Sequence, residues 1–178
     1  MHIIHAGGIS GPMVMPDRPD HLMAVNVGGS STLLQAAIGA KASTFLYCSS
    51  VSAVGPHYEE SPIGADYRPA PTDAYGCSKA AVDLMLRGLW RRIPLDVVSL
   101  RFTGIYDPGR RTTNVIDSLI TAALESQSVK LPRQGKYPYV YIDDAADAAV
   151  VANVFFETTT RPDLLCRLSR TDFARRSC

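Results

Sequence analysis

The sequence predicts an α/β fold in which the strands of a parallel sheet alternate with helices. Short apolar runs at residues 3–4, 45–48 and 95–102 have the length and composition of buried strands. The segments 20–40 and 74–92 lie between them and repeat apolar residues with helical periodicity. The repeating residues, expected to face the sheet, are Leu22, Val25, Leu33, Leu34 and Ala37 in the first segment and Ala80, Ala81, Leu84, Met85 and Leu89 in the second. Each connection is long enough for the crossover helix that parallel neighbours require.

Composition limits the class of protein. The 178 residues suit one domain, and 46% hydrophobic with 20% charged residues is ordinary for a globular chain. A net charge of +1 gives no electrostatic support for a nucleic-acid or membrane partner. No apolar run approaches the ~20 residues of a membrane span, and no signal-peptide pattern precedes the first strand. We therefore expect a cytoplasmic protein.

The cysteines and histidines predict no metal site. Neither class of residue has the spacing of a zinc site or of a disulfide framework, so reduced thiols are expected. Cys77, inside the predicted helix 74–92, is interpreted as a packing residue rather than a nucleophile. His5, at a strand end, is interpreted as structural. The cysteines are Cys48, Cys77, Cys166 and Cys178.

Tyr75 and Lys79 are the strongest candidates for chemistry. Their four-residue spacing places both side chains on one helix face, about 5–6 Å apart at Cβ. A lysine ammonium held there favours phenolate over phenol, so Tyr75 is a candidate acid/base for an alcohol proton near neutral pH. The alternative is a solvated pair on a surface helix.

Further motifs accompany this pair in a fixed order. They are residues 3–8 (IIHAGG), 26–30 (NVGGS), 45–50 (FLYCSS), 97–102 (VVSLRF), 105–109 (IYDPG) and 139–144 (YVYIDD). The ordered set resembles the extended short-chain dehydrogenase/reductase superfamily, specifically its NAD-dependent epimerase/dehydratase family, over about residues 2–156. The resemblance implies a Rossmann-type doubly wound parallel sheet, NAD or NADP as cofactor, a small-molecule substrate, and a homodimer if the chain were complete.

The family's phosphate-binding turn has no counterpart in these residues. A dinucleotide fold of this type begins with a strand, a Gly-rich turn and a helix whose N-terminus holds the pyrophosphate. Neither Gly7–Gly8 nor Gly28–Gly29 has that form. By resemblance the chain starts at the family's fourth strand, so we expect an incomplete, N-terminally truncated fold.

The resemblance also sets the domain boundaries. Residues 1–156 correspond to a partial NAD(P)-binding domain that includes part of the substrate region. Residues 157–178 form an atypical tail with five arginines. A truncated or frame-shifted end explains this tail as well as a genuine basic tail does.

The family's catalytic residues map onto three positions. Counting back from Gly55, Ser50 matches the catalytic Ser/Thr, which hydrogen-bonds the reacting oxygen, while Ser49 is interpreted as a cap of the strand end. Tyr75 matches the base. Lys79 matches the lysine that promotes its ionisation and holds the nicotinamide ribose.

Cofactor contacts are implied at the first strand end. Ala6, Gly7 and Gly8 match the turn that passes close to the ribose and phosphates of the cofactor. Tyr75 and Lys79 also match residues that contact the cofactor. An ordinary strand-exit turn is the alternative for Gly7 and Gly8. Asn26 matches a family asparagine and is expected to tie its helix to neighbouring backbone.

Four local expectations concern the surroundings of the site. Thr72 or Asp73 caps the helix that carries Tyr75. Helices are expected at 114–126 and 145–156, and a late strand at 139–142 leads to the helix-opening pair Asp143–Asp144. Val54, Gly104 and Asp107 replace residues that the family usually has near its substrate. Arg110 and Arg111 have two alternative interpretations: they bind a diphosphate through bidentate hydrogen bonds, or they are solvated at the surface.

The implied reaction is hydride transfer between a sugar-like carbinol and a nicotinamide ring, with a nucleotide sugar as the family's commonest substrate class. The competing interpretation is a non-catalytic fragment or remnant of such an enzyme. The missing Gly-rich turn and the unusual tail favour the remnant for this chain. The intact Ser50, Tyr75 and Lys79 set favours the enzyme for its family.

Overall fold

The structure is a computed structural model. It describes residues 1–11, 14–56, 63–64, 68–109, 112, 114–129 and 138–158, with side chains as far as Asn153. The chain divides into two compact units. One comprises Met1–Arg101 together with the chain from Ala149 onward, and the other comprises Phe102–Ala148.

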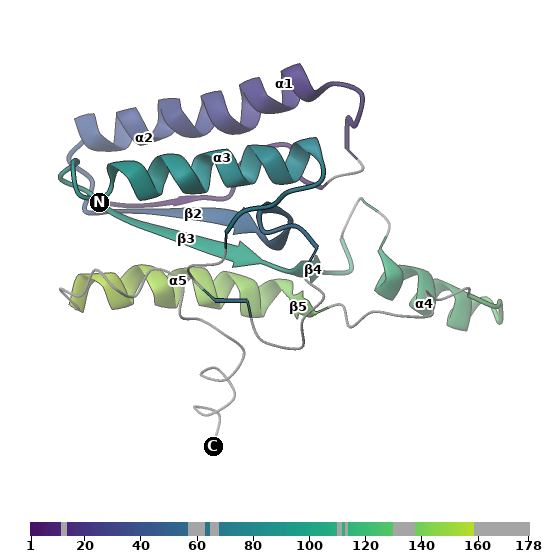
Figure 1. Cartoon of the computed structure of the whole chain (residues 1–178). Coiled ribbons are helices and arrows are strands. Elements are labelled where there is room, and N and C mark those ends of the chain that lie inside the picture. Colours follow the sequence, from purple (N-terminus) through teal and green to yellow (C-terminus); the bar gives the residue numbers. More distant parts are fainter. Residues whose placement is uncertain are drawn as a thin grey trace. The chain divides into compact units, whose positions relative to one another are not determined.

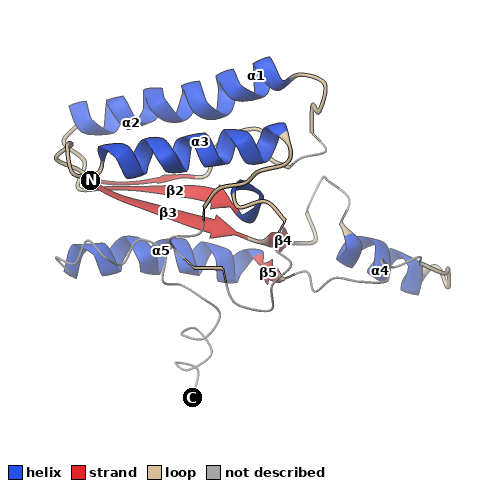
Figure 2. Ribbon diagram, in the orientation of Figure 1, coloured by secondary structure: helices blue, strands red, loops and turns tan. Residues whose placement is uncertain are grey.

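A three-stranded sheet forms the centre of the first unit. Its strands are β1 (His2–His5), β2 (Thr44–Ser50) and β3 (Asp96–Phe102), in the order β1-β2-β3. β1 and β2 pair in parallel with Ile3 opposite Phe45, and Figure 2 shows all three arrows pointing the same way. The predicted α/β class with a parallel sheet is therefore confirmed.

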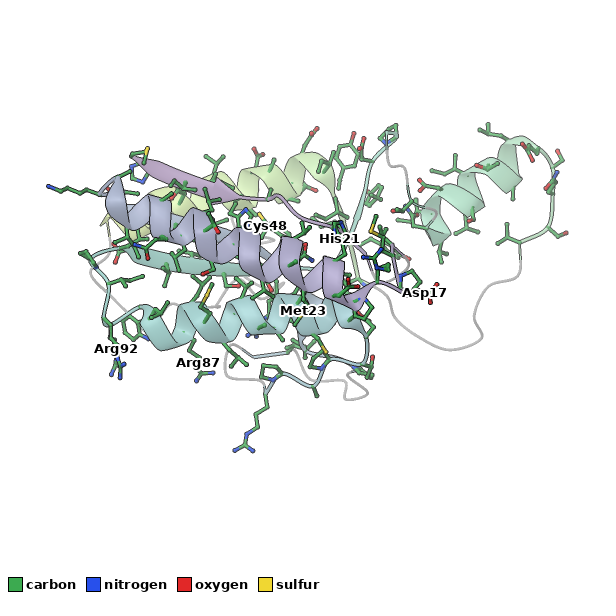
Figure 3. The ribbon with its side chains drawn as sticks, turned by 90° about the horizontal axis from the view of Figure 1, so that it is seen from above. Asp17, His21, Met23, Cys48, Arg87 and Arg92 are labelled. Atoms are coloured by element: carbon green, nitrogen blue, oxygen red, sulfur yellow. The ribbon has the colours of Figure 1, made fainter. Side chains whose placement is uncertain are left out.

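Two long helical segments lie side by side on one face of this sheet (Figures 1 and 3). The first is continuous: α1 (Pro19–Met23), a π-helical turn η1 (Ala24–Gly28) and α2 (Gly29–Gly39). The second is α3 (Ala74–Leu89), as predicted apart from its last three residues. On the opposite face lies the part of α5 (Ile142–Thr158) that starts at Ala149, where Asn153 is hydrogen-bonded to Thr44 of β2.

The core lies between the sheet and the two helices. Its members come from α2, β2, α3 and β3 and include Leu34, Ala37, Phe45, Tyr47, Val82, Leu86 and Val97. Leu84, expected on the buried face of α3, is 53% exposed instead. The buried face of α3 carries Lys79 and Asp83 among its apolar residues. Apolar periodicity alone therefore predicts the wrong position for this face.

The π-helical turn explains a second error of the same kind. Val25 was assigned to the buried face, but it is 37% exposed and the neighbouring Asn26 is buried. A π turn contains one residue more than an α turn, so it rotates the following side chains relative to a regular helix. The buried face of η1 is therefore polar.

The second unit contains a small parallel pair of strands. β4 (Gly104–Tyr106) pairs with β5 (Tyr139–Tyr141), and α4 (Val115–Leu124) is capped by Asn114, whose side chain accepts from the Asp117 amide. β4 was not predicted. A Cβ on Gly104 would lie 2.8 Å from the Tyr139 ring, so glycine permits this close pairing.

Several predictions concern the remaining segments. The late strand ends at Tyr141, one residue before its expected limit, and α5 begins at Ile142 rather than Ala145. Asp143 and Asp144 lie in its first turn, as expected of a helix-opening pair. Residues 57–62, 65–67 and 159–178, together with Arg110 and Arg111, lie outside the described residues. The roles expected for the arginine pair and the tail therefore stay predictions.

The described residues also allow a check of the cysteines, of clusters that could bind a metal, and of helices that could span a membrane. Cys48 and Cys77 are free thiols, as expected, but Cys77 is exposed, so its interpretation as a packing residue is wrong. No cluster of metal-binding side chains occurs in the described part of the chain. No helix there is long and apolar enough to cross a bilayer.

The edge strand β1 is the basis of a prediction that the isolated 178-residue chain self-associates. β1 is an outer strand of the described sheet, and Ile4 on it is 43% exposed. An uncovered edge offers backbone N–H and C=O groups to another chain. We expect oligomers or aggregates in size-exclusion chromatography, reduced by grafting a strand–helix–strand segment upstream of Met1. A sharp monomer peak with a cooperative melt above about 55 °C would contradict this.

Candidate active site

The first turn of α3 is fixed by its cap and by a glycine. The Asp73 side chain accepts a hydrogen bond from the Gly76 amide at 2.7 Å, so Asp73 rather than Thr72 is the cap. A Cβ on Gly76 would lie 2.4 Å from the Ser52 carbonyl oxygen. The absence of that Cβ lets the helix start pack directly on the turn that follows β2. Tyr75 is thereby placed beside this turn.

Ser50 ends β2 and opens this same turn. Its Oγ accepts a hydrogen bond from the Ser52 amide at 3.1 Å, which caps the short 3-10 helix Val51–Ala53. A hydroxyl that accepts one hydrogen bond can still donate its proton. Ser50 can therefore donate to an oxygen of a bound molecule. Ser49, by contrast, donates to the buried Asp83 carboxylate at 3.0 Å.

Lys79 is buried behind Tyr75. Its Nζ donates to the Cys48 carbonyl at 2.8 Å and lies 4.7 Å from the centroid of the Tyr47 ring and 5.8 Å from that of Tyr75. Burial lowers the pKa of Lys79, while Cys48 and Asp83 act in the opposite direction. Tyr75 is 8% exposed and Lys79 7% exposed. The alternative of a solvated surface pair is therefore wrong.

The turn after β1 leaves its backbone open. Ala6, Gly7 and Gly8 are exposed, and Gly8 has φ of +137°, a conformation that favours glycine. A Cβ on Gly8 would also lie 2.8 Å from Asn26 Oδ1. The chain here can pass close to a ligand on its outer side while it rests on Asn26 on its inner side.

Asn26 ties this turn to α3. Its Oδ1 accepts from the Ile9 amide at 2.8 Å, and its Nδ2 lies 3.0 Å from the Ile9 carbonyl and 2.9 Å from Ser78 Oγ. Ser78 in turn donates to the Tyr75 carbonyl at 2.7 Å. The structure thus gives Asn26 the positional contacts expected of it, from within the π-helical turn.

His5 has a structural environment. Ser30 Oγ donates to the Asn26 carbonyl at 2.5 Å, so the 2.8 Å contact with His5 Nε2 is donated by the imidazole. Burial, and then the charge of Lys79, lower the pKa of His5. A neutral His5 that positions the first helix agrees with the structural interpretation of this residue.

All six predicted site residues belong to the first unit. Because the carboxyl ends of parallel strands meet at one edge of a sheet, the turn at 6–8 and Ser50 open toward the same side, where α3 begins. Sequence reasoning missed Tyr47 and Asp83, which surround Lys79. Asp83 lies four residues after Lys79, and that spacing on the same helix face was the available signal.

Residues 1–162 match the NAD dependent epimerase/dehydratase family. The chain belongs to this family. Among curated relatives, the dTDP-D-glucose 4,6-dehydratase of Mus musculus is 26% identical over 126 residues, which is 70% of this chain and 35% of the relative. The family expected from the ordered motifs is confirmed.

Solved structures show the same fold. The UDP-N-acetylglucosamine 4-epimerase from Methanobrevibacter ruminantium aligns with TM-score 0.77 and 20% identity over 86% of this chain and 51% of its own. The UDP-glucose 4-epimerase of Thermus thermophilus, in complex with NAD, aligns with TM-score 0.72 and 25% identity over 85% and 52%. The predicted Rossmann-type α/β fold is confirmed in incomplete form. The chain spans about a third of the curated relatives' length and half of these structures.

Proposed function

We propose that this chain forms part of an NAD(P)-dependent enzyme that acts by hydride transfer on a sugar-like carbinol, with a nucleotide sugar as substrate. The observation that carries the proposal is the buried pair Tyr75 and Lys79 on α3 beside Ser50. Family membership supports the reaction class. The nucleotide-sugar enzymes among its relatives support the substrate class.

Each residue has a role that follows from its position. Tyr75 takes the proton of the substrate hydroxyl as general base. Ser50 donates a hydrogen bond to the reacting oxygen and so orients it. Lys79, whose Nζ is 5.8 Å from the Tyr75 ring centroid, stabilises the negative charge that develops on the phenol oxygen.

The residues present fit part of a nicotinamide cofactor. The exposed backbone of Ala6, Gly7 and Gly8 carries at most a methyl side chain, so a ribose or phosphate can approach it closely. Lys79 and Tyr75 would meet the nicotinamide ribose from the side of α3. When bound there, the nicotinamide ring would supply the hydride acceptor and donor of the reaction. The Thermus thermophilus relative, crystallised with NAD, supports this assignment.

The reaction is tested by incubating the chain with NAD⁺ and UDP-glucose or dTDP-glucose. A parallel sample carries an upstream strand–Gly-rich turn–helix segment grafted from a relative. We expect NADH absorbance or a new sugar product by NMR in the grafted protein. If the grafted protein folds and binds NAD⁺ but changes none of these sugars, the proposed substrate class is wrong.

A non-catalytic role is the second candidate. It is the alternative to the enzyme for these 178 residues, in which the Gly-rich pyrophosphate turn has no counterpart. For the isolated chain we expect NAD(H) and NADP(H) to bind more weakly than about 1 mM, or ~4 kcal/mol, because no helix N-terminus is provided for the pyrophosphate. Low-micromolar affinity in calorimetric titration would contradict this expectation.

A homodimer is proposed for the complete protein. Family resemblance implies a dimer contact on the outer faces of α1 and α3, and the exposed apolar residues Met23 and Leu84 lie on these helices. Paired helices of two copies would cover them. Light scattering on the grafted protein, with Leu84→Glu as the disrupting variant, distinguishes this dimer from association through β1.

A further inference from the structure

Two consecutive residues of β2 are bonded to two residues one turn apart on α3. The Cys48 carbonyl accepts from Lys79 Nζ at 2.8 Å, and the Ser49 hydroxyl donates to Asp83 Oδ2 at 3.0 Å. Two adjacent hydrogen bonds therefore join α3 to β2. The helix donates the first, through Lys79, and accepts the second, through Asp83. One of them fixes the ammonium of Lys79, and the other fixes the strand residue next to Ser50.

The Asp83 carboxylate accepts hydrogen bonds from three side chains. Besides Ser49, its carboxylate accepts from Ser99 Oγ at 2.5 Å and from Arg101 Nε at 3.0 Å, both on β3. Its side chain is 5% exposed, and that of Arg101 14% exposed. A buried carboxylate is stable only when it is paired and hydrogen-bonded, so these contacts hold it in place as an anion.

We propose that Asp83 is a positioning residue for the active site, because its carboxylate clamps the ends of β2 and β3 to α3 and its negative charge offsets the burial of the Lys79 ammonium. The proposal rests on the proposed function for the meaning of the site, but its test does not require activity. Asp83 itself does not reach a reacting atom. It acts through Lys79 and through the strand that carries Ser50.

The electrostatics agree with this geometry. Burial lowers the pKa of Lys79, and Cys48 and then Asp83 raise it. Without the Asp83 carboxylate, fewer groups oppose the effect of burial on the pKa of Lys79, so this pKa is expected to be lower. Among the described residues, the charged or titratable groups that contact Lys79 or act on its charge come from three elements: His5 of β1, Tyr47 and Cys48 of β2, and Tyr75 and Asp83 of α3. Arg101 of β3 lies against Asp83.

The test is an NMR titration of the lysines. The chain has four, Lys41, Lys79, Lys130 and Lys136, so ¹³C-lysine labelling gives few signals, and Lys79→Arg identifies that of Lys79. Its Cε shift is followed between about pH 6 and pH 11 in the wild-type chain and in Asp83→Asn. We expect the Lys79 midpoint to lie at a lower pH in Asp83→Asn than in the wild-type chain, because the Asp83 charge raises the pKa of Lys79.

The control variant is Asp96→Asn, which removes the same charge at an exposed position at the start of β3. We expect it to leave the Lys79 midpoint unchanged. If Asp83→Asn folds, by circular dichroism, and Lys79 titrates as in wild type, the proposal is overturned. Failure of nucleotide-sugar turnover would leave this titration unaffected, so the two proposals fail separately.

A second variant covers the case in which Asp83→Asn does not fold. Asp83→Leu combined with Arg101→Met replaces both partners of the buried ion pair by apolar residues, a change that buried pairs often tolerate. Because this double variant also removes the Arg101 guanidinium, its Lys79 midpoint is compared with that of Arg101→Met, and we expect it to be the lower of the two. Equal midpoints in these two folded variants also overturn the proposal.

Discussion

Tyr75→Phe is expected to reduce turnover of the grafted protein by about 10²–10⁴-fold, while NAD⁺ binding stays nearly unchanged. The substitution removes the phenol oxygen that takes the substrate proton, and groups of this kind typically contribute that factor. The ring remains, so the 8% exposed position keeps its packing. The measurement is steady-state turnover of the nucleotide sugar together with calorimetric NAD⁺ affinity.

Lys79→Ala separates the roles of the two residues. It is expected to lower both turnover and NAD⁺ affinity, because Lys79 is assigned contacts with the base and with the ribose. Lys41→Ala, at an exposed lysine, is the control. If Tyr75→Phe retained more than about a tenth of wild-type turnover, Tyr75 would not be the general base.

Gly55→Ala is expected to destabilise the chain by about 2–4 kcal/mol. Gly55 has φ of +85°, and a Cβ there would lie 1.9 Å from the Ala70 carbonyl oxygen. Backbone strain of about 1–3 kcal/mol adds to an overpacking cost of similar size. The Ala70 amide donates to the Val54 carbonyl at 3.0 Å. A shift of Ala70 away from the added Cβ would therefore also disturb the turn that follows Ser50.

Urea unfolding at fixed protein concentration measures this effect as a lower midpoint with an unchanged slope. The control is Gly88→Ala, at an exposed position of α3 where an added Cβ meets no atom within 4 Å. Because alanine favours a helix over glycine, we expect Gly88→Ala to be neutral or to stabilise by up to about 1 kcal/mol. Equal unfolding midpoints for the two variants would show that the turn accommodates a side chain at Gly55.

The errors at Leu84 and Val25 have one physical origin. Apolar periodicity assumes that polar residues face water, but the buried face of α3 carries Lys79 and Asp83. Their burial depends on partners from distant parts of the chain, Cys48 on β2 and Arg101 on β3. The same holds for Asn26, which is buried because it bonds to Ile9 and Ser78.

The sequence by itself determined the α/β class, the order and approximate limits of the main strands and helices, and the family, because these depend on local periodicity and on motifs in fixed order. It also placed Tyr75 and Lys79 one helical turn apart. Only the tertiary structure decided that this pair is buried, that Ser50 lies in the turn on which α3 begins, and that Asp83 anchors Lys79's surroundings. Those facts depend on hydrogen bonds between residues far apart in the chain, which no local pattern records.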